Sequence, residues 1–157
     1  MTIRNATISD VQALVALNRG VQAMHAASFP ERFKRDTSDD DVARAFSEMV
    51  QAPSGYWLVS EEKGPIGFLN AEFRDKPETW CGVAQRVCYL GGIVVAPGSR
   101  RAGVARALVE ELKREANARG VSCIELDVWA FNETARAVFA SLGFVPLMQR
   151  MTMPVDG

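Results

Sequence analysis

The stretch VVAPGSRRAGVARAL, Val94–Leu108, decides how the rest of the chain is interpreted. Its valines are typical of a buried strand, and Pro97–Ser99 predicts a turn directly after it. Apolar residues at helical spacing follow at once, so a helix is expected to begin within a few residues. The first N–H groups of such a helix have no partner inside it. Small residues at Ala102, Gly103 and Ala105 leave that backbone open to a ligand.

Three arginines surround this junction, at positions 100, 101 and 106. Positive side chains beside unpartnered helix N–H groups are typical of a phosphate-binding site. The P-loop pattern GxxxxGK[ST] and the dinucleotide pattern GxGxxG are both absent. From this stretch alone, a plain strand-to-helix turn with solvated arginines remains an alternative.

Composition narrows the class of protein. The chain has 157 residues, 48% hydrophobic and 24% charged, which predicts one globular domain over residues 1–157. A formal net charge of −1 gives no basic field for nucleic acid. The three cysteines lack metal-ligand spacing, so no metal site is expected. Neither a signal core nor a membrane span is apparent, and we expect a cytoplasmic protein without membrane contact.

The pattern of apolar residues predicts the order β-α-α-β-β-β-α-β-α-β. YWLVSEE and IGFLNAEFR read as a hairpin, and RVCYLGGIVVAP reads as a long strand. The double glycine Gly91–Gly92 inside that strand predicts a bulge. FVPLMQRMTMPV is expected to form a terminal strand or bent pair. The fold class is therefore α+β (mixed α/β), with a central, mostly antiparallel mixed sheet flanked by helices.

Two motifs resemble signatures of the GNAT superfamily of acetyl-CoA-dependent N-acetyltransferases. RRAGVA, at 100–105, matches its [QR]-x-x-G-x-[GA] pattern. NETARAVFASLGF resembles its second signature, on which these residues fall: Asn132, Ala135, Phe139, Leu142, Gly143 and Phe144. The two motifs stand in order with a strand between them, and the resemblance covers essentially the whole chain. It implies a GNAT-like domain that uses acetyl-CoA as co-substrate.

The resemblance also implies where coenzyme A would lie. Pantetheine is expected between two splayed strands, paired with the backbone of Ile93–Val95, a form of strand addition. The pyrophosphate is expected on the N–H groups from Arg101 to Arg106. The residues implied in binding are Ile93, Val94, Val95, Arg100, Arg101, Ala102, Gly103, Val104, Ala105, Arg106, Asn132, Ala135, Arg136 and Phe139.

One position departs from the family pattern. The aromatic of the second signature is usually a tyrosine, taken as the acid that protonates the thiolate, and here it is Phe139. Another donor can replace it: Tyr89, Ser141 or water. Alternatively the thiolate leaves unassisted, since its pKa of about 8.5 is modest. Slow activity, or binding of acyl-CoA without turnover, are the remaining alternatives.

For the general base, Glu72 is the leading candidate, with Asp127 and Glu125 behind it. Glu125 and Asp127 share one face of their predicted strand. A partly buried carboxylate could take the amine proton through a water. For each acid taken singly, the alternative is a solvated residue on a strand face.

The resulting hypothesis is an N-acetyltransferase that acts on a primary amine of a small molecule or peptide. The amine would attack acetyl-CoA directly in a ternary complex, without a metal. A non-catalytic acyl-CoA-binding or sensor domain is the alternative from another class, and a nucleotide-phosphate-binding module is a third. The acceptor site is expected from the first helices and the 75–85 loop. A homodimer is a possible assembly of this chain.

Overall fold

The computed structural model describes residues 1–155 of the chain. Its contacts divide it into two compact units, Met1–Asp127 and the part that begins at Val128. The predicted single domain over 1–157 stays a prediction, and its last two residues lie outside the described ones. Within residues 1–155, no helix combines the length and apolar character needed to cross a bilayer.

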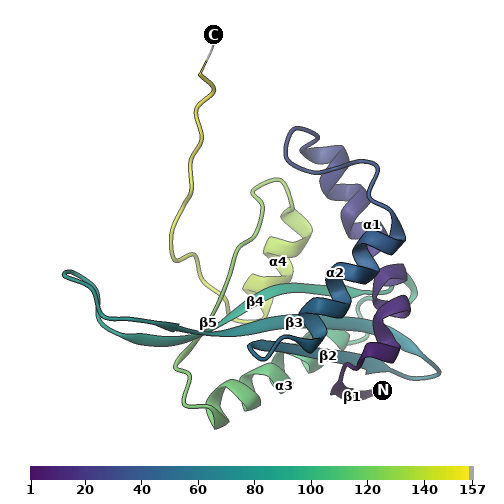
Figure 1. The fold of residues 1–157 in the computed structure, drawn as a ribbon, viewed down its shortest axis with the longest axis horizontal. Coiled ribbons are helices and arrows are strands. Elements are labelled where there is room, and N and C mark those ends of the chain that lie inside the picture. The colour runs from purple at the N-terminus through teal and green to yellow at the C-terminus, as the bar shows by residue number, and fades with distance from the viewer. Residues whose placement is uncertain (156–157) are drawn as a thin grey trace. The chain divides into compact units, whose positions relative to one another are not determined.

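The first unit is built on a five-stranded sheet in the order β1-β2-β3-β4-β5 (Figure 1). The strands are β1 (Thr2–Asn5), β2 (Gly55–Glu61), β3 (Pro65–Lys76), β4 (Gln85–Val95) and β5 (Cys123–Leu126). Every neighbouring pair is antiparallel except β4 and β5, which run parallel. The mixed, mostly antiparallel sheet expected from the sequence is thereby confirmed.

Helices α1 (Val11–Ser28) and α2 (Asp39–Gln51) follow β1 and pack against one face of the sheet. Their core with that face is apolar: Leu14, Trp57, Val59, Phe68 and Val94. Phe46 of α2 packs on Trp57 and Phe68, with ring centroids 5.1 and 6.0 Å apart. The even-numbered residues of β3, from Phe68 onward, therefore point toward α1 and α2.

Helix α3 (Val104–Ala118) connects β4 to β5 and lies against the opposite face. A Cβ built on Gly67 would lie 3.1 Å from a methyl of Val104, so the sheet here approaches α3 without room for a side chain. The helix buries one stripe: Val104, Leu108, Val109, Leu112 and Ala116. This spacing is the helical period that the sequence predicted. The start of α3 is therefore fixed against the sheet.

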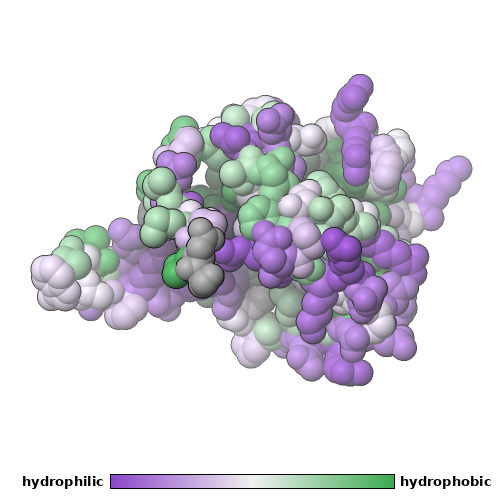
Figure 2. Space-filling model, turned by 90° about the horizontal axis from the view of Figure 1, so that it is seen from above, coloured by the Kyte–Doolittle hydropathy of each residue, from purple (hydrophilic) through white to green (hydrophobic). Residues whose placement is uncertain are grey.

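Strands β3 and β4 continue past the other strands as a hairpin arm, which Figure 1 shows on the left. The arm pairs as far as Lys76 with Gln85, and its flanks are hydrophilic (Figure 2). Its tip is turned by Thr79, whose hydroxyl accepts from Gly82 N–H at 2.9 Å. Trp80 at the tip is 96% exposed. The arm is thus an ordered extension of the sheet.

The pairing of β3 with β4 is interrupted by one extra residue. Asn70 pairs with Gly92, whereas Ala71 pairs with Leu90, so Gly91 has no partner on β3. The bulge predicted at Gly91–Gly92 is therefore confirmed. It bends the ladder where β4 changes from the arm to the centre of the sheet.

The second unit contains α4 (Glu133–Ser141), capped by Asn132, whose Oδ1 accepts from Ala135 N–H at 3.0 Å. The expected terminal strand over residues 144–155 is not formed. Pro146 and Pro154 each remove an N–H donor near one end of this segment, which disfavours a regular ladder. Its alternation of apolar residues was therefore a misleading signal.

An ion pair between Arg4 and Asp10 connects β1 to the start of α1. The Asp10 carboxylate, 7% exposed, accepts two bonds of 2.8 Å from Arg4. The Arg4 guanidinium holds the pKa of this carboxyl at about 2, against an ordinary value of 3.8. The stabilisation is therefore complete above about pH 4 and is lost as the pH falls from about 4 to about 2.

We expect Asp10→Asn to lower the free energy of unfolding at pH 7 by about 2 kcal/mol. The difference from the wild-type protein should shrink progressively between about pH 4 and pH 2. Urea denaturation across this range measures it, with Asp36→Asn on the surface as the control. A difference that stays constant down to pH 2 would contradict the assignment.

Candidate functional site

One edge of β4 is uncovered in its second half. β5 pairs with β4 only from Val87 to Leu90, and its ladder ends at Leu126. Residues 91–95 pair with β3 on one side, and no strand within residues 1–155 pairs with their other side. The backbone of Ile93–Val95, implied by the sequence in pantetheine binding, lies along this edge. An extended ligand could add there as a strand.

The turn between β4 and α3 is compact and unusual in its backbone. After the short 3-10 turn Pro97–Ser99, Arg101 and Gly103 have positive φ angles of 64° and 79°. A positive φ is uncommon in any residue other than glycine and often marks a ligand site. Gly103 is the N-cap of α3 and offers no side chain to cap it. The N–H groups at the start of α3 therefore face outward without a side-chain cap.

Arginine side chains stand around this helix start. Arg100, Arg101 and Arg106 are all exposed, and Arg100 Nε donates to the carbonyl of Val95 at 3.4 Å. That contact directs one guanidinium along the uncovered end of β4. Three positive charges next to an uncapped helix N-terminus form a site suited to phosphate groups.

A cavity of about 270 Å³ lies on the α1 and α2 face of the sheet. Its lining comes from the end of α2, the loop before β2, and strands β2, β3 and β4: Met49, Ala52, Ser54, Gly55, Trp57, Asn70, Ala71, Glu72, Arg74, Tyr89 and Gly91. The 75–85 loop contributes no residue to this cavity. An acceptor site built from the first helices and that loop stays a prediction. Gly91, the extra residue of the bulge, forms part of the wall of this cavity.

Glu72 is held in the cavity by two neighbours. Arg74 Nε donates to its carboxylate at 2.9 Å, and Ser54 Oγ donates at 3.3 Å. Glu72 and Arg74 lie two residues apart on β3, so both point to the same face. The carboxylate keeps a fixed orientation and remains partly exposed.

Tyr89 lies beside this pair, opposite Glu72 in the ladder. Its ring lies beneath the Arg74 guanidinium, 4.1 Å from the ring centroid, and its hydroxyl donates to Asp127 at 3.0 Å. The three sequence-predicted catalytic candidates, Glu72, Tyr89 and Asp127, are thus brought into one cluster. Arg74 connects them, and sequence analysis missed it. The alternation of Asn70, Glu72 and Arg74 along β3 was the signal that could have found it.

The other acidic and hydroxyl candidates have different surroundings. Glu125 forms an ion pair with Lys76 of the arm at 2.7 Å. Ser141 Oγ donates to the carbonyl of Val138 at 2.7 Å, within α4. Neither residue lines the cavity around Glu72.

The residues of the second signature form their own local structure in the second unit. Phe139 packs edge-on against Phe144, with centroids 5.6 Å apart. Arg136 Nη1 donates to the carbonyl of Ala130 at 3.4 Å. With Asn132 and Ala135 they belong to α4 and its cap, and their contact with coenzyme A stays a prediction.

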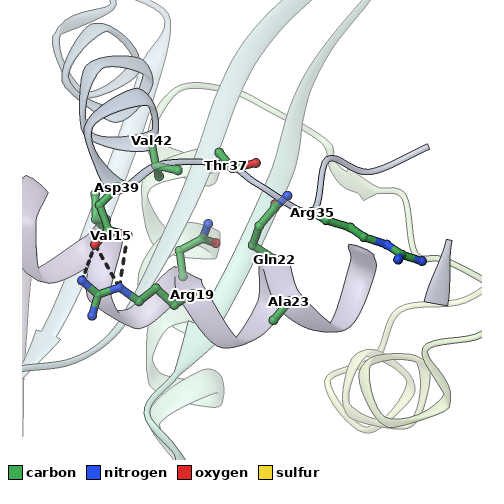
Figure 3. Close-up of a pocket in the computed structure, with 9 residues that line it drawn as sticks. Val15, Arg19, Gln22, Ala23, Arg35, Thr37, Asp39 and Val42 are labelled. Carbon is green, nitrogen blue, oxygen red and sulfur yellow. Dashed lines mark hydrogen bonds and ion pairs between the residues drawn. The ribbon is translucent and has the colours of Figure 1, made fainter. Parts of the chain in front are cut away.

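A smaller cavity of about 130 Å³ lies between α1, residues 35–37 and α2 (Figure 3). Three of its polar side chains already have partners. Arg19 forms an ion pair with Asp39, and Gln22 Nε2 donates to the carbonyl of Lys34 at 3.1 Å. These contacts hold the linker between the two helices, so we interpret this cavity as structural.

Comparison with known proteins identifies the family. Residues 19–144 match the model of the "Acetyltransferase (GNAT) family". The chain belongs to this family. It is 32% identical to a mycothiol acetyltransferase of Beutenbergia cavernae over 141 residues, which are 90% of this chain. They span only 43% of that relative's length.

Solved structures share the GNAT fold. A tetramutant of a Bacillus halodurans protein aligns with TM-score 0.91 at 24% identity, covering 99% of this chain and 100% of that one. An aminoglycoside N-acetyltransferase in complex with CoA aligns with TM-score 0.77 at 22% identity, covering 99% and 95% of the two chains. The shared fold and the family membership confirm the predicted fold class.

The cluster around Arg74 is exposed, so we expect it to contribute little to stability. Arg74→Ala should change the free energy of unfolding by less than about 1 kcal/mol, because exposed ion pairs are weak. Arg86→Ala, which removes a comparable pair with Asp75 on the arm, is the matched control. Urea denaturation compares the two variants. A loss above about 2 kcal/mol for Arg74→Ala alone would mark the cluster as structural.

Proposed function

We propose that this GNAT protein transfers the acetyl group of acetyl-CoA to a primary amine. The observation that carries the proposal is the continuous path from the uncapped start of α3, along the uncovered edge of β4, to the cavity containing Glu72 and Tyr89. A phosphate site, a strand edge and a cavity with ionisable groups follow one another along a single strand. Acetyl-CoA has its pyrophosphate, its pantetheine arm and its thioester in the same order.

The pyrophosphate of coenzyme A would bind the N–H groups at the start of α3. Gly103 and Ala102 leave these groups open, and Arg100, Arg101 and Arg106 supply positive charge. The left-handed conformation of Arg101 turns the backbone tightly before the helix. The amides of pantetheine would then pair with the backbone of Ile93–Val95.

In the reaction, the amine nitrogen forms a bond to the thioester carbonyl carbon, and the C–S bond then breaks. Glu72 takes the amine proton, directly or through a water. Tyr89 protonates the leaving thiolate after its hydroxyl turns away from Asp127, and it regains a proton from solvent. Tyr89 would thus protonate the thiolate in place of Phe139, which has no hydroxyl group.

The acceptor would enter the cavity beside Trp57 and Tyr89. Its volume of about 270 Å³ is near the lower end of ligand pockets, so it suits the amine-bearing end of a molecule rather than a whole large one. Mycothiol acetyltransferase, the relative named above, bears the name of a small-molecule enzyme. We extend the acceptor class to primary amines of small molecules or peptides.

The direct test is thiol release from acetyl-CoA with a panel of primary amines and the purified protein. Acetylated amine, identified by mass spectrometry in equal amount to released thiol, is the expected result. Binding of acetyl-CoA with no product on any amine would instead favour a non-catalytic acyl-CoA-binding domain. Phe139, in place of the usual tyrosine, is the observation behind that second candidate.

We expect Gly103→Glu to abolish coenzyme A binding. The variant adds bulk and negative charge where the phosphates would bind, and it places a side chain at a φ of 79°. Gly103→Ala is the control, since it shares the backbone strain but adds neither the bulk nor the charge of the glutamate. Calorimetry with CoA measures the affinity, and circular dichroism checks the fold. Unchanged affinity in folded Gly103→Glu would disprove the phosphate site.

Two variants locate the proton donor for the thiolate. Tyr89→Phe should lower kcat by about 10²-fold, the low end of general-acid contributions. Phe139→Tyr should change kcat only a few-fold, because Tyr89 already supplies the proton. A rise of about 10²-fold in Phe139→Tyr, with Tyr89→Phe unaffected, would move the role to position 139.

A further inference from the structure

Asn70 is placed where β3 meets the bulge. It pairs with Gly92 in the ladder, and its side chain lines the same cavity as Glu72 and Tyr89. The side chain is partly buried. Within residues 1–155, no other group forms a hydrogen bond with its carboxamide. This residue belongs to neither family signature.

The two glycines of the bulge make room for this carboxamide. A Cβ on Gly91 would lie 2.5 Å from Asn70 Nδ2, and a Cβ on Gly92 would lie 2.9 Å from Asn70 Oδ1. The amide therefore occupies the space that side chains of β4 would otherwise fill. It lies across the backbone at the end of the uncovered edge.

Four other polar side chains of the cavity are already engaged. Arg74 and Ser54 donate to Glu72, and Tyr89 donates to Asp127. The Asn70 amide, by contrast, can meet a new acceptor without first losing a partner. A donor prepared in this way stabilises developing charge with little reorganisation.

We propose that the Asn70 carboxamide donates a hydrogen bond to the acetyl oxygen of acetyl-CoA. The inference rests on the proposed function, which brings pantetheine along Ile93–Val95 and its thioester to the bulge. When the amine adds to the carbonyl carbon, the C=O electron pair moves to this oxygen. The electron pair returns to the C=O bond as the C–S bond breaks and the thiolate leaves. Asn70 holds the oxyanion throughout and exchanges no proton.

The test uses two variants and a readout that needs no acceptor. Asn70→Leu keeps most of the side-chain volume and removes the donor. Asn70→Ala also removes the donor, and its smaller side chain fits this site even if leucine disturbs the fold. Asn18→Leu, which removes an amide from the other cavity, is the matched control. Infrared difference spectra of acetyl-CoA with a ¹³C-labelled thioester carbonyl report the hydrogen bond to the acetyl oxygen in each complex.

We expect the bound carbonyl band to lie at lower frequency in the wild-type protein and in Asn18→Leu than in both Asn70 variants. With an accepted amine, kcat of the Asn70 variants should fall by about 10²-fold. Their affinity for CoA should stay within about twofold, because the donor contacts only the acetyl oxygen. Equal carbonyl frequencies in the wild-type protein and in Asn70 variants that bind acetyl-CoA would overturn the role of Asn70 and leave the proposed function unaffected. Failure of the wild-type protein to bind acetyl-CoA would overturn the proposed function as well.

Discussion

The site depends on one mismatch in strand length: between Asn70 and Ala71 of β3, strand β4 carries one residue more. That residue, Gly91, bends β4 and ends its pairing with β5 nearby, since the parallel ladder reaches only Leu90. Beyond this point the strand has one neighbour instead of two. The cavity, the uncovered edge and the approach to α3 all begin from this position.

Within the proposed function, the two ends of this strand have opposite electrostatic roles. Arginines and helix N–H groups lie after Val95, whereas Glu72 and Asp127 lie around Tyr89. Both groups of charges are exposed, so water and salt weaken them in the empty protein. A bound ligand that displaces water would strengthen both. Substrate affinity and catalysis are therefore expected to depend on how completely the site closes over acetyl-CoA.

The sequence predicted most of the fold because its signals were local. Gly91–Gly92 predicted the bulge, and the spacing of apolar residues after the Pro97–Ser99 turn predicted the buried stripe of α3. The terminal strand failed because alternation alone cannot supply a pairing partner, and Pro146 opposes one. The cluster around Glu72 and Tyr89 was predicted only in part, because Arg74 was missed: it donates to Glu72 on its own strand and lies over the ring of Tyr89 on the next one. Such contacts need the register, which no short motif encodes.

The bulge also changes the spacing of residues that share a face of β4. Along a regular strand, residues an odd number of positions apart point to opposite faces, yet Tyr89 and Val94, five apart, share one. Cys88 and Leu90 are buried in the other half of the alternation. Without the extra residue Gly91, Tyr89 and Val94 would be four apart and would share a face by ordinary alternation, with Cys88 and Leu90 still on the other face. The pattern of buried and exposed residues along β4 therefore does not need Gly91; what the extra residue adds is the bend of the strand and the space beside Asn70.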